Sequence, residues 1–470
     1  MLKTISLIAL FFAATHTLSA QELTWVKHMG GIYDDVDYAV AVSNTGSVYS
    51  TGMFYGNVDL DPGPGVYLLN IGGTFIQKLD ADGSFNWARQ INAEGYAIAI
   101  DAGQNIYITG KYAGTVDFDP GPGVHNLSSL DAGFDIFVLK LDSAANFIWV
   151  RGFEGTDYSF WDMGTYVTPD NLGSVYVCGG FKDTVDFDPG LGIHSEVSGP
   201  SMSTFLLKLD TGGNFTSVKQ FPSNYLPWTR IQMAFGNIGE MYLSGVNNTN
   251  TYKLDSLSNI IWTKSLSGGV YGMVKNIDGS TYFTGAFQGA FDFDPSSAVY
   301  YLSSTGTEAD IFVVKLDSQD NFEWAKKVGG GGYDCGINVN TDANGDVYVT
   351  GNFKSTVDFD PGPDSYIMTS FGEEDMFVLK LNKQGGFMSA KQFGSPRREY
   401  TSNATINSNG ELFVVGYFED TCDFDPGGQV YDIASNGDND AFVLKLSSTL
   451  ELKTLGTQCG PLTIFPNPTH

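Results

Sequence analysis

Residues 116–123 read VDFDPGPG, an acidic element that recurs along the chain. Five further copies share its Asp-x-Asp-Pro centre, and they begin at Val58, Val185, Phe291, Val357 and Cys422. An element that returns at intervals is the sequence mark of a repeat architecture, so the repeat has to be interpreted before any single motif.

Three other markers recur beside this acidic element. The first is an aromatic-x-x-Gly segment, which begins at Tyr49, Tyr107, Tyr176, Tyr242, Tyr282, Tyr348 and Phe413. The second resembles FVLKLD and begins at Phe75, Phe137, Phe205, Tyr252, Phe312, Phe377 and Phe442. The third is centred on a tryptophan, at Trp25, Trp87, Trp149, Trp262 and Trp324, with weaker versions at Val218, Ala390 and Leu452.

These markers are short, rich in aromatic and β-branched residues, and bounded by Gly, Asn and Asp. Such segments indicate β-strands, and no segment shows a sustained 3.6-residue apolar period. A fourth, weaker strand precedes each aromatic-x-x-Gly strand across a tight turn. In one unit the four expected strands are Ala97–Asp101, Ile106–Tyr112, Ile136–Leu141 and Phe147–Gly152.

Seven consecutive units of four antiparallel strands predict an all-β fold, a seven-bladed β-propeller over residues 21–456. An open solenoid is the alternative, but its repeats are usually shorter and it needs end caps. We expect the N-terminal strand, residues 23–29, to close the ring by joining blade 7. The alternative is that residues 450–455 take that place. Blade 4 lacks the acidic element between Gly245 and Lys253, so a blade can form without it.

Composition and charge narrow the classes of partner. The chain of 470 residues is 42% hydrophobic and 17% charged, with 57 Gly, which is typical of a turn-rich protein with a packed core. Its net charge of −28 argues against nucleic acid, because phosphate binding needs clustered Lys and Arg. The charge is compatible with divalent cations, with cationic ligands, or with solubility alone.

Both ends of the chain carry signals of export. Residues 1–20 have a positive start at Lys3, an apolar run at 5–14 and a Leu-Ser-Ala cleavage site, as a secretory signal peptide does. No other segment approaches the length of a membrane-spanning helix. Residues 457–470 form a linker followed by a short stretch, 463–469, that resembles the opening of the C-terminal sorting domain of type IX secretion. Only the first strand of such a domain is present. From the two signals together, we expect a secreted or cell-surface protein that uses this route.

Taken together, the strand blocks and the acidic element resemble the seven-bladed β-propeller (SBBP) repeat family of secreted bacterial proteins. The strand pattern is also similar to the NHL repeat. The resemblance covers about residues 23–455 and implies a propeller, export and often a sorting tail. Family members mostly lack an assigned activity, so the resemblance implies no catalytic residue.

The cysteines and histidines predict little chemistry. Cys178, Cys335, Cys422 and Cys459 are scattered, which favours free or structural thiols, with a Cys422–Cys459 bridge as an alternative. His125 and His194 occupy a repeat position where other copies carry tyrosine, so an aromatic packing role is expected.

The paired aspartates of the acidic element are the candidate metal ligands. In an extended VDFD segment both Asp side chains lie on one side and the Phe on the other, and Pro-Gly then turns the chain. One interpretation is structural, with Phe118 packed between blades and Asp119 capping the turn. The other is a Ca²⁺ site, because carboxylates and turn carbonyls are ligands that Ca²⁺ prefers. Its predicted ligands are Asp59, Asp61, Asp117, Asp119, Asp186, Asp188, Asp292, Asp294, Asp358, Asp360, Asp423 and Asp425.

Further carboxylates are expected on the same face of the ring. The connections after the second and fourth strands of a blade emerge on one face, and the aspartates that open the third strands should lie there too. These are Asp135, Asp310, Asp375 and Asp440, together with acidic loops at residues 31–35 and 332–334. Ca²⁺ is the one cofactor that the sequence suggests.

Three functions remain open from the sequence. Near-identical blades without a unique polar cluster favour a non-enzymatic, monomeric binding or scaffold module for an extracellular protein or glycan. A Ca²⁺-dependent hydrolase of glycan or phosphate substrates is an alternative by analogy of fold, with Arg397-Arg398 as its one dense basic spot. A structural or adhesive surface module is the third.

Overall fold

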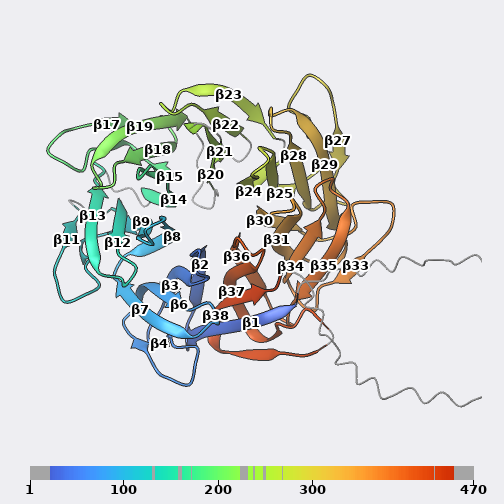
Figure 1. Ribbon diagram of the computed structural model, residues 1–470, viewed down its shortest axis with the longest axis horizontal. Helices are drawn as coiled ribbons and strands as arrows, with labels where there is room; N and C mark the ends of the chain where they lie inside the picture. The colour runs from blue at the N-terminus through green and yellow to red at the C-terminus, as the bar shows by residue number, and fades with distance from the viewer. Residues whose placement is uncertain are drawn as a thin grey trace, which may run out of the picture.

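The computed structural model describes residues 22–129, 133–156, 161–170, 172–222, 231–236, 239–246, 250–266, 268–427 and 429–448. Over these residues the chain forms strands and turns and no α-helix. Seven antiparallel sheets, each built on four strands, stand around a common axis (Figure 1). The prediction of a seven-bladed, all-β propeller is confirmed.

Each blade contributes one strand to the inner wall of the ring and a second strand hydrogen-bonded to it. The inner strands are β2 (Asp35–Val42), β8 (Glu94–Ile100), β14 (Met163–Pro169), β20 (Gln232–Phe235), β24 (Gly269–Lys275), β30 (Cys335–Thr341) and β36 (Glu399–Ile406). The second strands are β3 (Val48–Phe54), β9 (Ile106–Tyr112), β15 (Val175–Phe181), β21 (Met241–Val246), β25 (Thr281–Phe287), β31 (Val347–Phe353) and β37 (Leu412–Asp423).

The third and outer strands complete each blade. The third strands are β6 (Gly73–Leu79), β12 (Asp135–Leu141), β18 (Ser203–Leu209), β22 (Asn250–Leu254), β28 (Asp310–Leu316), β34 (Asp375–Leu381) and β38 (Asp432–Leu446). The outer strands are β7 (Phe85–Ile91), β13 (Phe147–Phe153), β19 (Phe215–Pro222), β23 (Ile260–Ser265), β29 (Phe322–Gly330), β35 (Phe387–Phe393) and β1 (Leu23–Gly31).

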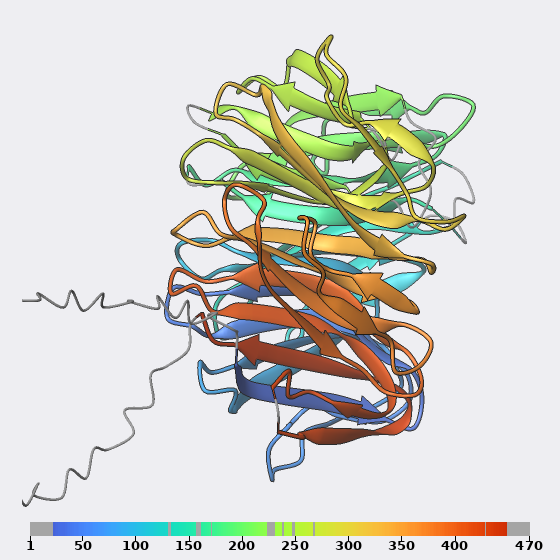
Figure 2. The same ribbon diagram turned by 90° about the vertical axis from the view of Figure 1, so that its right-hand side faces the viewer.

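The seventh blade is built from both ends of the described chain. Strand β1 pairs antiparallel with β38, in a register that sets Val26 opposite Leu444, and β38 pairs on its other side with β37. Figure 2 shows the blue N-terminal strand lying among the red strands of this sheet. Residues 450–455, the alternative closing strand, lie outside the described residues, as do the predicted signal peptide and sorting segment.

The recurring glycine of the aromatic-x-x-Gly strand lies where the second strand and the inner strand approach one another closely. The inner strand bulges opposite it, as the register shift between Gly95 and Ala97 shows in the second blade. A Cβ atom added to Gly110 would lie 1.8 Å from the main-chain oxygen of Glu94. A side chain cannot occupy that space, so glycine is required for the second strand to pair with a bulged inner strand.

Hydrophobic packing joins neighbouring blades. The second and third strands are almost wholly buried, and one apolar cluster combines Trp87 and Ile91 of the first blade with Ile108 and Phe137 of the second. Such clusters bury both faces of each sheet, which is what holds a propeller together. No helix in the described part of the chain is long and apolar enough to cross a membrane.

Candidate functional site

The acidic element forms a short hairpin between the second and third strands of a blade. In the second blade this hairpin consists of β10 (Thr115–Asp117) and β11 (Asn126–Ser128), at the periphery of the ring in Figure 1. Four other blades carry the same feature as a separate strand pair: β4 (Val58–Asp59) with β5 (Leu68–Leu69), β16 (Thr184–Asp186) with β17 (Ser195–Val197), β26 (Ala290–Asp292) with β27 (Tyr301–Ser303), and β32 (Thr356–Asp358) with β33 (Ile367–Thr369). In the seventh blade the ends of β37 and β38 form it, and in the fourth blade only residues 247–249, which lie outside the described residues, separate β21 from β22.

Both aspartates of the hairpin bind its own backbone. Oδ1 of Asp117 accepts the N–H of Asp119 (3.1 Å) and the N–H of His125 (2.9 Å), which closes the loop. Oδ1 of Asp119 accepts the N–H of Gly121 at 2.8 Å, which caps the Pro-Gly turn. The turn-capping role expected of Asp119 is therefore present.

The same bonds recur in the other five hairpins. The first aspartate of each accepts two backbone N–H groups and the second accepts one, in the pairs Asp59 and Asp61, Asp186 and Asp188, Asp292 and Asp294, Asp358 and Asp360, and Asp423 and Asp425. The described residues hold no group of three or more His, Cys, Asp or Glu side chains arranged for a metal ion. Ca²⁺ binding by the hairpins stays a prediction.

The aromatic residues of the hairpin serve packing. Phe118 is fully buried, with its ring 4.8 Å from that of Phe137, in the cluster that spans the first and second blades. His125 stacks on Phe147, which opens the outer strand of the same blade, at 3.8 Å between ring centroids. Tyr366 lies on Phe387 in the same way, so the aromatic role expected of this position is present.

Four of the hairpins are bridged to the end of the outer strand of the preceding blade, or to a residue just after it. Strand β4 pairs with the end of β1, and β32 pairs with the end of β29. Single bridges join Gly155 to Val185 and Gly394 to Asp423. The connections after the second and fourth strands therefore meet on one face, as expected, and the hairpins link successive blades.

Each aspartate that opens a third strand lies at a blade junction, beside an acid at the start of the inner strand of the next blade. The four pairs are Asp135 with Asp162, Asp310 with Asp334, Asp375 with Glu399, and Asp440 with Asp35. All eight side chains are exposed by 3% or less. The sequence placed the four third-strand aspartates on an acidic rim with the hairpins, whereas the structure buries them between blades, and their role as metal ligands stays a prediction.

Glycines at the ends of the outer strands make room for these buried carboxyl groups. A Cβ atom on Gly329 would lie 2.2 Å from Cγ of Asp310, and one on Gly394 would lie 2.2 Å from Oδ2 of Asp375. Gly30 stands in the same relation to Asp440, at 2.0 Å. The Gly-Gly and Gly-Ser pairs that end these strands are therefore part of the acid junctions.

Burial governs the protonation of the junction acids. Removal from water raises the pKa of Asp35 and of Asp334 to about 7, and that of Glu399 to about 8. Backbone N–H groups oppose this rise, and the charge of the neighbouring acid adds to it. In Asp334, for example, the N–H groups of Lys354 and Gly330 act downward, and the charge of Asp310 acts upward.

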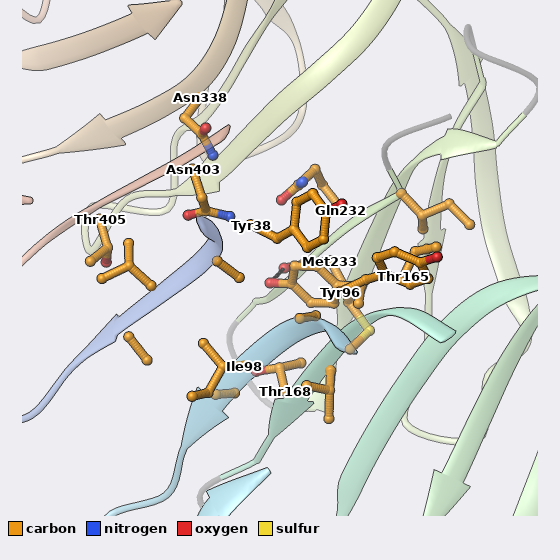
Figure 3. Close-up of a pocket in the computed structure, with 18 of the residues that line it drawn as sticks. Tyr38, Tyr96, Ile98, Thr165, Thr168, Gln232, Met233, Asn338, Asn403 and Thr405 are labelled. Carbon is orange, nitrogen blue, oxygen red and sulfur yellow. Dashed lines mark hydrogen bonds between the residues drawn. The ribbon is translucent and has the colours of Figure 1, made fainter. Parts of the chain in front are cut away.

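A cavity of about 820 Å³ lies on the axis of the ring, lined by all seven inner strands. Figure 3 shows Tyr38 and Tyr96 close to one another at this cavity, with Gln232, Asn338 and Asn403 nearby. The rings of Tyr38 and Tyr96 are 5.6 Å apart. The charged residues of the lining are Lys111 and Lys275. The sequence did not indicate this site, because its lining residues come from seven different blades and lie far apart along the chain.

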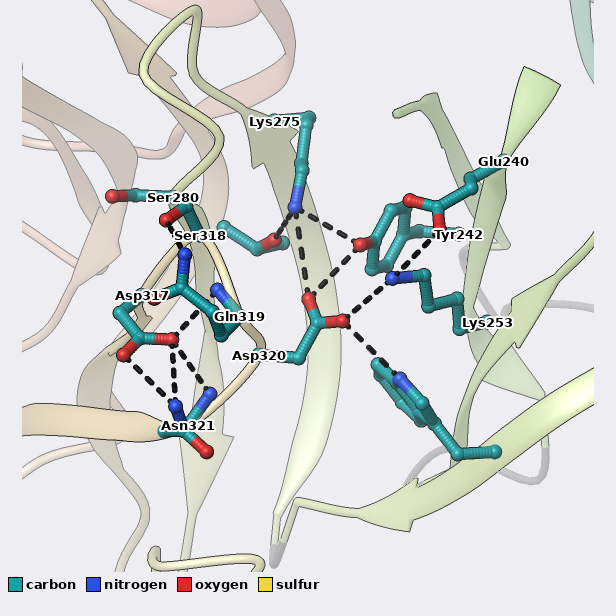
Figure 4. A network of polar contacts seen from close by, with 12 residues as sticks. Glu240, Tyr242, Lys253, Lys275, Ser280, Asp317, Ser318, Gln319, Asp320 and Asn321 are labelled. Carbon is teal, nitrogen blue, oxygen red and sulfur yellow. Dashed lines mark hydrogen bonds and ion pairs between the residues drawn. The ribbon is translucent and has the colours of Figure 1, made fainter. Parts of the chain in front are cut away.

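A second polar cluster joins the fourth and fifth blades (Figure 4). Asp320, in the turn between β28 and β29, accepts hydrogen bonds from Lys253 Nζ (2.8 Å), the Tyr242 hydroxyl (2.9 Å) and Trp262 Nε1 (3.3 Å). Lys275 Nζ lies 3.7 Å from the same carboxylate. Burial acts to raise the pKa of Asp320, but the hydrogen bonds and charge of Lys253 hold it below its usual value. Tyr242, Lys253 and Trp262 belong to the fourth blade, which has no acidic hairpin.

The remaining predicted features have ordinary surroundings. Arg397 and Arg398 are exposed and face Glu419, Glu373 and Glu374. Cys178, Cys335 and Cys422 are buried and form no disulfide within the described residues, and Cys459 lies outside them. Nε2 of His28 lies 3.9 Å from Oδ2 of Asp440.

Comparison with known proteins finds distant similarities. No family model matches the chain. Among solved structures, it is similar to a catalytically inactive virginiamycin B lyase from Staphylococcus aureus, at 8% identity over 89% of this chain and 99% of that one, with a TM-score of 0.44. A DUF4221 family member from Bacteroides vulgatus matches at 9% identity over 93% and 100% of the two chains, with a TM-score of 0.36. BamB from Moraxella catarrhalis matches at 11% identity over 90% and 100%, with a TM-score of 0.35.

One curated protein matches part of the sequence. An uncharacterised WD repeat-containing protein of Acanthamoeba polyphaga mimivirus is 24% identical over 112 residues. The match spans 21% of this chain and 8% of that protein. A propeller fold does not by itself assign a function.

Proposed function

We propose that this chain is an exported, non-enzymatic propeller that binds a neutral polar ligand, a glycan, in the cavity on its axis. The observation that carries the proposal is the chemistry of the lining. Aromatic rings, amides and hydroxyl groups from different blades converge on one cavity, in a protein whose net charge is −28.

The aromatic part of the lining suits the apolar faces of sugar rings. Tyr38 and Tyr96 come from the first and second blades, and their rings are tilted against one another by 53°. Tyr400 of the seventh blade stacks on Tyr417 with an interplanar angle of 18°, which holds its ring in place. Tyrosines offer a flat apolar surface together with a polar tip, which is the combination that a sugar requires.

The polar part of the lining has unused hydrogen-bonding capacity. Oδ1 of Asn338 and Oγ1 of Thr165 are buried, and neither has a hydrogen-bond partner among the described residues. Buried polar atoms are normally satisfied by protein, water or ligand. Both residues line the cavity, so this unused capacity lies next to the place where a hydroxyl-rich ligand would bind.

The dimensions and the charge of the cavity agree with this class of ligand. Its volume of about 820 Å³ lies within the range of ligand pockets. Lys111 is paired with Glu94 at 3.2 Å, and Lys275 donates to Tyr242 and Thr281, so both lining lysines are engaged. A neutral ligand needs no further countercharge.

Export is the second part of the proposal. It is supported by the signal-like residues 1–20, by the sorting-like segment at 463–469 and by the resemblance of the repeats to the SBBP family. Mass spectrometry of the protein recovered from its native host should find a mature N-terminus at Gln21 in the extracellular or surface fraction. A full-length chain that begins at Met1 in the cytosol would contradict it.

Binding is tested by calorimetric titration of the mature chain with neutral hexasaccharides of the glucan, xylan and mannan types. We expect at least one to bind, and Tyr38→Ala combined with Tyr96→Ala to weaken that binding about tenfold or more, or about 1.4 kcal/mol. Tyr301→Ala is the matched control, because Tyr301 is exposed on the β26–β27 hairpin, away from the cavity.

Two results would overturn the glycan proposal. One is the absence of binding across the panel; the other is equal binding by the wild type and the Tyr38/Tyr96 variant. Cleavage of a bound saccharide during the titration would show an enzyme, contrary to the proposal.

A further inference from the structure

The junction between the sixth and seventh blades contains two buried carboxyl groups with open oxygen atoms. Asp375 and Glu399 are fully buried there. Asp375 Oδ2 accepts the N–H of Phe371 (3.0 Å) and Nε2 of Gln392 (2.6 Å), and Glu399 Oε2 accepts the N–H of Ser395 (2.9 Å). Asp375 Oδ1 and Glu399 Oε1, in contrast, have no hydrogen-bond partner among the described residues.

Basic side chains stand beside the acid pairs of two other junctions. Lys327 Nζ lies 3.4 Å from Asp310 Oδ2, and His28 Nε2 lies 3.9 Å from Asp440 Oδ2. At the junction of the sixth and seventh blades, the nearby Arg397 and Arg398 face other, more exposed acids. Within the described residues, no ion pair reaches Asp375 or Glu399.

Two buried carboxylates without a countercharge are unfavourable, because each loses hydration and repels the other. Asp375 acts on Glu399 through its charge. The two open oxygens belong to adjacent blades, and the junction is closed to water. A hard cation between them would neutralise both charges and satisfy both oxygens.

We propose that Asp375 and Glu399 bind a divalent cation, with Ca²⁺ preferred, that links the sixth blade to the seventh. Ca²⁺ accepts carboxylate and backbone carbonyl oxygens in flexible arrangements, whereas Mg²⁺ demands near-ideal octahedral geometry and keeps several waters. A closed junction with two carboxylates and surrounding main chain suits the first ion better. The site is separate from the hairpin site expected from sequence, whose aspartates in the seventh blade accept backbone N–H groups through Oδ1.

The link has a mechanical consequence. The seventh blade is the one assembled from both ends of the described chain, so its contacts with the sixth blade help to keep the ring closed. Glu399 also donates its backbone N–H to the main-chain oxygen of Glu374, next to Asp375. A cation would reinforce a junction that main-chain hydrogen bonding already joins.

The test uses the mature chain, stripped of metal with a chelator and then returned to Ca²⁺. We expect about 5 mM Ca²⁺, above the dissociation constants of many extracellular sites, to raise Tm by about 2–5 °C, because only the folded chain holds the site. Equilibrium dialysis with radioactive Ca²⁺ counts the bound ions directly. Asp375→Asn combined with Glu399→Gln should lower that count by one and reduce the rise in Tm.

Two matched variants make the result specific. Asp310→Asn combined with Asp334→Asn changes the equivalent junction between the fifth and sixth blades, where Lys327 lies beside Asp310. This variant should still bind the ion at Asp375 and Glu399. Asp423→Asn combined with Asp425→Asn changes the hairpin of the seventh blade and should also retain the junction ion. If the hairpin variant loses that ion and the Asp375/Glu399 variant keeps it, the proposed location is wrong.

A chain that binds no Ca²⁺ and keeps the same Tm with and without chelator overturns the proposal. A Ca²⁺ count that is equal in the wild type and the Asp375/Glu399 variant also overturns it. If that variant is then more stable than the wild type at neutral pH, a proton shared by the two carboxyl groups explains their burial better than a cation does. Saccharide binding in the axial cavity is measured separately, so failure of either proposal is recognised without the other.

Discussion

Trp149 in the outer strand of the second blade donates its indole N–H to the main-chain oxygen of Thr211, in a turn of the third blade, at 3.1 Å. Trp324 makes the same bond to Lys383, and Trp25 makes it to Ala81. The recurring tryptophan therefore joins each of these blades to the next. Trp87 is the exception, because its Nε1 is buried without a hydrogen-bond partner among the described residues.

This difference supports a prediction with a built-in control. Trp149→Phe should lower the free energy of unfolding by about 1 kcal/mol more than Trp87→Phe does, because only the former loses a hydrogen bond. Both substitutions remove similar apolar area, and both rings lie against a tyrosine of their own blade, Tyr107 and Tyr49. Urea denaturation of both variants measures the difference, and equal losses would contradict the role assigned to the indole.

The bulge opposite Gly110 predicts a costly small substitution. Gly110→Ala should destabilise the second blade by about 1–3 kcal/mol or more, since the new methyl group overlaps the oxygen of Glu94 and the strands must separate. Gly331→Ala is the control, because nothing lies within 4 Å of a Cβ atom there, and a change within about 0.5 kcal/mol is expected. Thermal unfolding compares the two, and an unchanged Tm for Gly110→Ala would show that the strands can part freely.

Local patterns account for the fold. The second strand of the second blade was predicted at Ile106–Tyr112, and these are the bounds of β9. Its aromatic start, its Gly and the Asn before it are all local signals. Closure by the N-terminal strand was also expected, because the outer-strand marker has eight copies with the weaker ones included, against seven of the other strand markers, and the N-terminal copy carries the tryptophan.

The candidate sites depend on contacts that no local pattern contains. The sequence placed Asp375 on an acidic rim, but its partner Glu399 belongs to the next blade and begins an inner strand. Alternation along a strand predicts which side a carboxylate takes, yet it cannot show that Asp117 turns back to bind the N–H of His125. The axial cavity is still harder to predict from sequence, because each blade contributes only a few residues to its lining. Glycines at the ends of the outer strands were the available signal for the junctions, since they mark close approach.

The hairpins provide a third prediction, which separates packing from capping. Phe118→Ala should cost about 3–5 kcal/mol, because it leaves a cavity between the first and second blades. Asp119→Ala should cost about 0.5–1.5 kcal/mol, the usual value of one hydrogen bond, since its bond to Gly121 lies near the surface. Equilibrium unfolding of both variants gives the ratio. A larger loss for Asp119→Ala would indicate that the carboxylate does more than cap the turn.

The junction of the fifth and sixth blades predicts a pH dependence. Burial raises the pKa of Asp334 from 3.8 to about 7, with the N–H groups of Lys354 and Gly330 acting against it and the charge of Asp310 acting with it. The folded chain therefore binds this proton more tightly than the unfolded chain does. Its stabilising contribution is complete below about pH 4 and is lost as the pH rises to about 7.

The consequence is a decline in stability between about pH 4 and pH 7, to which Asp35 and Asp440 contribute in the same direction. Asp334→Asn should make this decline shallower by no more than about 4 kcal/mol, the limit for a shift of about three pKa units. Lys327, which lies 3.4 Å from Asp310, remains in the variant. Denaturation with urea at a series of pH values measures the slope, and an identical slope in the variant would show that Asp334 is ionised in the folded chain at all of them.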